Sequence, residues 1–107
     1  MNIRMKGTKI KLTVPIKDYI QEKMDMLDKY LGDIEVQNLD FEVGMAVGGQ
    51  NSGKIFRAEV NLSVPGELLR VEKTEKDLYK AIDKVKDHLV RSIRRYKEKR
   101  IDKKRKV

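Results

Sequence analysis

Five side chains that can donate hydrogen bonds to phosphate recur at helical spacing in the C-terminal third of the chain. They follow one another at intervals of four, four, three and four residues, and they are Lys80, Lys84, His88, Arg91 and Arg95. At 100° per residue these positions fall within a sector of about 80° on an α-helix. Such a basic helix face attracts polyanions, so the spacing predicts a surface for nucleic acid.

The positive charge of the chain is concentrated at the same end. The formal net charge is +8, and basic and acidic side chains balance over residues 1–90, so the whole excess falls in residues 91–107. A solvated helix face usually mixes Glu with Lys at i, i+4 spacing, but after Arg91 only Glu98 and Asp102 are acidic. The imbalance favours nucleic-acid binding over a merely solvated face. Further cations widen the face: Arg94, Lys97, Lys99 and Arg100.

Residues for catalysis or metal binding are scarce. The chain has no cysteine and a single histidine, His88, so we expect no metal site, no cofactor and no nucleophile–histidine pair. The segment Gly48–Lys54 is similar to a phosphate-binding P-loop, but Ile55 replaces the Ser or Thr that binds Mg²⁺. Because the segment lies between two predicted strands, we expect a hairpin loop rather than the nucleotide-binding loop of a nucleotide-dependent enzyme. His88 is either a phosphate contact or a surface residue without a role.

RNA is favoured over DNA because the sequence has no helix-turn-helix, zinc or basic-zipper pattern to enter a major groove. The four tyrosines lie at or beside apolar stripes, which favours packing over base stacking: Tyr19, Tyr30, Tyr79 and Tyr96. Recognition of backbone and shape is therefore expected.

The apolar pattern predicts the elements that carry this surface. Alternating residues predict a first strand from Asn2 that continues beyond Gly7, and strands over 39–47, 56–64 and around 69–71. Helical spacing predicts a helix over 14–31, with Thr13 as its cap, and a second over 78–100. The expected fold is α+β, in the order β-α-β-β-β-α, with two helices packed on one face of a four-stranded sheet.

The length of 107 residues suits one domain, which we assign to residues 1–100. Residues 101–107 form a basic tail, expected to be disordered until it meets a polyanion. No apolar run is long enough for a signal peptide or a membrane span, and cysteine is absent, so we expect a cytoplasmic protein without a membrane or small-molecule partner.

Several motifs in this sequence resemble the ribosome hibernation-promoting factor and ribosome-associated inhibitor family. The similar segments are Thr13–Lys17, Lys23–Tyr30, Pro65–Glu72, Asp77–Asp83 and Arg91–Lys97. The resemblance implies a non-enzymatic inhibitor that binds the small ribosomal subunit and its rRNA in the mRNA/tRNA channel and promotes hibernation of idle ribosomes. Many relatives carry a second, dimer-forming domain, so the chain is either a short form or a fragment that lacks it.

The resemblance also implies site residues, and it adds Lys23 of the first helix. With the basic face, the predicted RNA-binding set is Lys23, Lys80, Lys84, His88, Arg91, Arg94, Arg95 and Lys99. His88 and Met26 stand where the family usually has lysine. The alternative is a general double-stranded RNA-binding module, which also packs two helices on one sheet face and reads shape.

Overall fold

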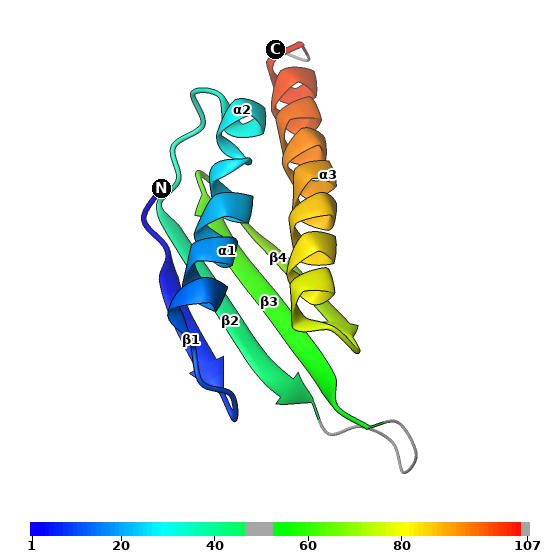
Figure 1. Ribbon diagram of the computed structural model, residues 1–107. Helices are drawn as coiled ribbons and strands as arrows, with labels where there is room; N and C mark the ends of the chain where they lie inside the picture. Colours follow the sequence, from blue (N-terminus) through cyan, green and yellow to red (C-terminus); the bar gives the residue numbers. More distant parts are fainter. Residues whose placement is uncertain (47–52, 106–107) are drawn as a thin grey trace.

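A computed structural model describes residues 1–46 and 53–105, with side chains through Ile101. The elements are β1 (Arg4–Thr8), α1 (Val14–Asp25), α2 (Asp28–Leu31), β2 (Asn38–Ala46), β3 (Ile55–Val64), β4 (Glu67–Glu75) and α3 (Leu78–Arg105). The sheet order is β1-β2-β3-β4, with β1 parallel to β2 and the other pairs antiparallel. The helices cover one face, with α1 and α2 toward β1 and α3 toward β4 (Figure 1). The predicted fold is confirmed.

The core lies between this sheet face and the helices. Alternate residues are buried over 39–43 of β2 and over 58–64 of β3, because alternate side chains of a strand point to opposite faces. From the helix side, the core receives Ile16, Ile20 and Met24 of α1 and Ile82, Val85, Leu89 and Ile93 of α3. Since these helix residues recur at three- and four-residue intervals, the stripes that predicted the helices are the stripes that are buried.

The first predicted helix is divided in two. The chain leaves α1 after Asp25 and re-enters a helix at Asp28, and the amide of Leu27 donates to the carbonyl of Met24 at 3.0 Å, which tightens the turn between them. Leu27 and Leu31 remain buried across the break. The apolar spacing therefore continues through the break and gave no sign of it. Thr13 caps α1 as predicted, accepting from the amide of Ile16 at 3.4 Å.

The first strand is shorter than predicted. It ends at Thr8, and Lys9 turns the chain with φ of 59°. A Cβ at Gly7 would lie 2.6 Å from the carbonyl oxygen of Ile10, so this tight return requires glycine. Ile10 and Leu12 then pack against the core from a connecting segment rather than from the strand.

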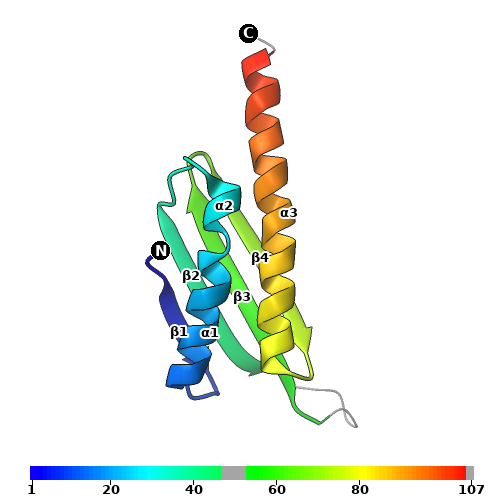
Figure 2. The same ribbon diagram turned by 45° about the horizontal axis from the view of Figure 1, so that its top comes forward.

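The last helix continues past the predicted end at residue 100. Lys and Arg favour helix, and positive charge near the C-terminus is stabilised by the helix dipole, so the segment expected to be a disordered tail is helical as far as Arg105. This end of α3 projects beyond the sheet (Figure 2). Residues 106 and 107 lie outside the described residues. The division into a binding domain and a tail stays a prediction.

The hairpin predicted over Gly48–Lys54 joins β2 to β3, whose ends pair at Ala46 and Ile55. Residues 47–52 of this segment lie outside the described residues. Within the described ranges, no group of three or more metal-ligating side chains comes together. None of the helices in those ranges has the length and apolarity that a bilayer crossing needs.

Candidate nucleic-acid interface

The two flanks of α3 have different neighbours. On one flank, Asp83 accepts a hydrogen bond of 2.5 Å from the hydroxyl of Tyr19 in α1. On the other flank, Lys99 lies 3.7 Å from Glu67 of β4, and Lys84 pairs with Glu75 of β4. The helix thus has an α1 flank and a β4 flank, separated by the buried stripe beneath and by solvent above.

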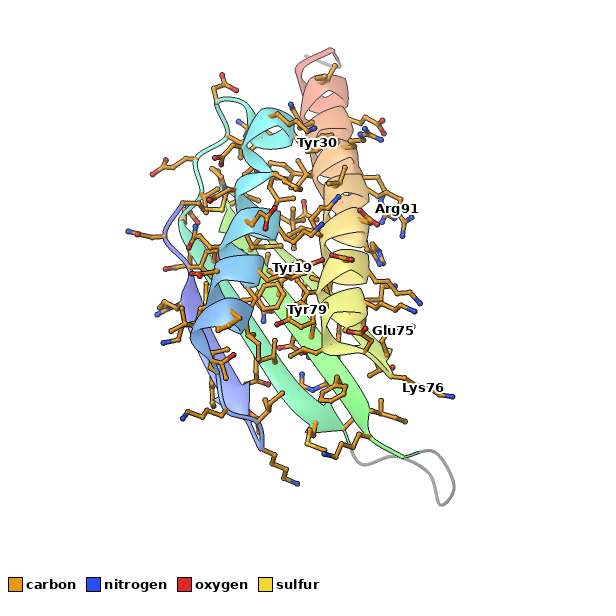
Figure 3. The ribbon with its side chains drawn as sticks, in the orientation of Figure 1. Tyr19, Tyr30, Glu75, Lys76, Tyr79 and Arg91 are labelled. Atoms are coloured by element: carbon orange, nitrogen blue, oxygen red, sulfur yellow. The ribbon has the colours of Figure 1, made fainter. Side chains whose placement is uncertain are left out.

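Most of the predicted RNA-binding residues share the β4 flank. It carries six of the eight: Lys80, Lys84, His88, Arg91, Arg95 and Lys99. Arg95 and Lys99 line a shallow hollow together with Glu67 and Arg70 of β4. Arg91 projects from α3 on the side away from α1 (Figure 3). The structure therefore brings the predicted stripe together as one surface.

The cations of this surface differ in whether they already form an ion pair with a carboxylate. Lys84 and Lys99 are paired with Glu75 and Glu67. Lys80, Arg91 and Arg95 are exposed, and none of them takes part in an ion pair between described residues. These three side chains can meet a phosphate without first giving up a carboxylate.

Lys23 and Arg94 lie apart from this surface, on the α1 flank. The ammonium of Lys23 is 3.3 Å from Asp83 and 5.2 Å from the ring centre of Tyr19, and only 20% of the side chain is exposed. The guanidinium of Arg94 lies 5.3 Å from the ring centre of Tyr30. The sequence placed all eight residues in one set, but the fold divides that set between two flanks.

Tyrosines join the helices on the α1 flank (Figure 3). The rings of Tyr19 and Tyr79 meet edge to face at 4.7 Å. The hydrogen bond to Asp83, followed by burial, raises the pKa of Tyr19 to about 12. Lys97 donates to the carbonyl of Tyr30 at 2.8 Å and so satisfies the end of α2. These contacts agree with the packing role that the sequence predicted for the tyrosines.

His88 occupies the middle of the β4 flank, and its Nδ1 is buried without a hydrogen-bond partner. Burial lowers its pKa below the usual range for histidine, and the charges of Lys73, Arg91 and Arg95 lower it further. Lys73 comes from β4 and was missed by the sequence reasoning, which followed only the period of the helix. Alternation along β4 could have found it, since Leu69 and Val71 are buried under the helices and Lys73 continues their side.

The opposite, helix-free face of the sheet also carries many charges, but there they are paired. Arg57 contacts Glu42, Glu59 and Glu72. Other pairs on this face are Arg4 with Asp40, Lys6 with Glu42, and Arg70 with Glu59 and Glu72. Cations and carboxylates match here, so we name this surface the balanced face. On the β4 flank of α3, by contrast, Lys80, Arg91 and Arg95 have no ion-pair partner among the described residues.

Comparison with known proteins identifies similar sequences. A model of the family described as Sigma 54 modulation protein / S30EA ribosomal protein matches residues 3–101. The ribosome hibernation promotion factor of Deinococcus radiodurans is 36% identical over 95 residues, covering 88% of this chain and 48% of that protein. The factor of the same name from Bacillus subtilis is 30% identical over 99 residues, covering 92% of this chain and 50% of that protein.

Solved structures are similar as well. The crystal structure of the Thermus thermophilus Protein Y N-terminal domain has a TM-score of 0.71 and 36% identity, covering 90% of this chain and 99% of that one. A ribosomal subunit interface protein from Coxiella burnetii has a TM-score of 0.76 at 17% identity, covering 92% of this chain and 99% of that one, and shows the fold alone. The chain spans about half the length of the curated relatives it matches. With the family match running through every element from β1 to α3, this chain belongs to the Sigma 54 modulation protein / S30EA ribosomal protein family.

Proposed function

We propose that this chain binds the small ribosomal subunit in the channel used by mRNA and tRNA and so promotes the hibernation of idle ribosomes. The observation that carries the proposal is the β4 flank of α3, where three exposed cations have no carboxylate partner among the described residues while the cations of the balanced face are paired. The relatives named ribosome hibernation promotion factor support it.

Binding of this kind needs no chemistry at a substrate. Lys80, Arg91 and Arg95 neutralise rRNA phosphates and release condensed counterions, which supplies affinity without reading base sequence. The 28 residues of α3 rise about 42 Å, so a stiff helix presents these cations at fixed spacing along the RNA. Inhibition then follows from steric occupation, because a bound chain excludes mRNA and tRNA. The proposed site of action is the cytoplasm, where ribosomes translate mRNA.

The remaining predicted contacts have secondary roles in this proposal. On binding, Lys84 leaves Glu75 and Lys99 leaves Glu67 to contact phosphate. Lys23 leaves Asp83 in the same way. Each such contact contributes less to the binding free energy than a contact from an unpaired cation, because it leaves a carboxylate without its partner near RNA. The basic end of α3 after residue 100 continues along the same RNA.

Membership of the family does not favour the alternative of a general double-stranded RNA-binding module. Competition on purified small subunits tests the difference directly. We expect tRNA and mRNA to displace the labelled chain, and an excess of arbitrary duplex RNA to leave it bound. A sucrose-gradient profile then shows whether the chain sediments with the small subunit. Displacement by duplex RNA but not by tRNA would overturn the proposal.

A further inference from the structure

His88 lies where the β4 flank is most strongly cationic. On α3 it is three residues before Arg91 and seven before Arg95, which places the three side chains on one face. From β4, Lys73 faces the same imidazole, and its charge acts on it together with those of the two arginines. A histidine surrounded in this way sits inside a cluster that has no anion of its own.

The neighbouring carboxylates are engaged elsewhere. The other charged residues on the helix side of β4 are Glu67 and Glu75, and they pair with Lys99 and Lys84. On α3, Asp87 precedes His88 but pairs with Lys86 at 2.7 Å. The helix α1 contacts the opposite flank of α3, through Tyr19 and Lys23. Among the described residues, no carboxylate pairs with the imidazole.

Burial and the neighbouring cations lower the pKa of His88 and so favour the neutral imidazole in the free chain. Its Nδ1 is buried and makes no hydrogen bond, whereas Nε2 belongs to a partly exposed side chain and is not among the buried atoms without a partner. A phosphate oxygen that reaches Arg91 and Arg95 can also accept a hydrogen bond from Nε2 once Nε2 takes up a proton from solvent, with the other ring proton on Nδ1. The negative charge of the phosphate offsets the field of the three cations that opposes protonation of the ring.

We propose that Lys73, His88, Arg91 and Arg95 form one phosphate site for the RNA backbone, and that His88 takes up a proton when this site is filled. The inference rests on the proposed ribosome binding and deepens it, since it makes the affinity depend on pH. Because the pKa of His88 is higher in the complex than in the free chain, affinity rises as pH falls through the interval between the two values. Below both values the full gain is present, and above both it is absent.

Binding to purified small subunits, measured from about pH 8 to about pH 5.5 at constant salt, tests the inference. A rise of one pKa unit on binding gives up to about tenfold tighter binding at the acidic end. Isothermal titration in two buffers of different ionisation enthalpy measures the proton uptake directly. The variant His88→Gln keeps a hydrogen-bonding side chain but cannot titrate, so we expect it to remove the extra pH dependence and the uptake.

A second measurement tests the placement of the cluster without ribosomes. His88 is the only histidine, so its imidazole NMR signals need no assignment. We expect Lys73→Gln to raise the pKa of His88 in the free chain, and Lys76→Gln, which removes the same charge just beyond β4, to leave it unchanged. An unchanged pKa in Lys73→Gln would overturn the site.

The outcomes separate this inference from the function on which it rests. Binding that strengthens with acidity in the wild type but not in His88→Gln supports the site. If the two proteins bind with the same pH dependence, the inference fails and ribosome binding stands. If neither protein binds small subunits at any pH, the proposed function itself fails and the inference fails with it.

Discussion

We expect the loss of positive charge to affect ribosome binding differently on the β4 flank and on the balanced face. Arg91 and Arg95 are exposed on the β4 flank and have no ion-pair partner among the described residues. Arg4 and Arg70 are also largely exposed, at 73% and 63% of the side chain, but both are paired on the balanced face. The double variants Arg91→Gln/Arg95→Gln and Arg4→Gln/Arg70→Gln lower the net charge equally at these two places.

The expected difference follows from counterion release. Each phosphate contact adds about 0.7 to 0.9 to the slope of log affinity against log salt, so loss of the two β4-flank arginines lowers the slope by roughly 1.4 to 1.8. Over a fourfold rise in salt, the wild type then loses about tenfold more affinity than this variant. The balanced-face variant should keep the wild-type slope, because its charges lie outside the contact and salt screens their long-range effect.

The assay is a binding isotherm of fluorescently labelled chain on purified small subunits at several salt concentrations between about 50 and 200 mM, the range over which such slopes are usually resolved. Thermal melts show that each variant folds. Equal reduction of the slope by both double variants would mean that net charge alone drives binding. An unchanged slope in Arg91→Gln/Arg95→Gln would mean that the β4 flank does not touch phosphate. Either result refutes the reasoning.

Three further predictions concern single residues. Glu75→Gln frees Lys84 from its carboxylate, so we expect tighter binding to small subunits and a slope steeper by up to about one contact, measured by the same isotherms. Tyr19→Phe removes the hydrogen bond to Asp83 and should lower the free energy of unfolding by about 0.5 to 1.5 kcal/mol in denaturant titrations. Because folding raises the pKa of Tyr19 from about 10 to about 12, the wild type should lose this advantage as pH rises through that interval, and Tyr19→Phe should show no such loss. Ile93→Ala opens a cavity at a side chain with no exposed surface and should cost about 2 to 5 kcal/mol in the same titrations.

The fold was predictable because its signals are local. Strand and helix periods sort side chains into buried and exposed faces without knowledge of tertiary contacts, and the stripes found in this way are the ones that the core uses. The break between α1 and α2 was not predicted, because Leu27 and Leu31 stay buried and continue the apolar spacing through it. The end of α3 was predicted too early, because the apolar stripe stops before the helix does. The basic residues beyond the stripe favour helix on their own.

The interface was predictable only in part, because a helical period locates cations but not their partners. Spacing placed Arg91 and Arg95 on one face correctly. It could not show that Lys23 is held by Asp83 of another helix, or that Glu75 of a strand reaches Lys84. These partners are distant along the chain, and only the packing of α3 over β4 and beside α1 brings them together.

Pairing therefore changes which residues carry the proposed binding. A cation that already has a carboxylate must exchange one anion for another, and the exchange leaves that carboxylate close to RNA. On the β4 flank the carboxylates Glu75 and Glu67 occupy Lys84 and Lys99, and between these two pairs lie His88, Arg91 and Arg95. Unpaired charge on this flank therefore lies in the middle of the helix face and at Lys80 near the start of the helix, with Lys73 added from the strand itself. Affinity should depend on these unpaired residues far more than on the number of basic residues in the helix.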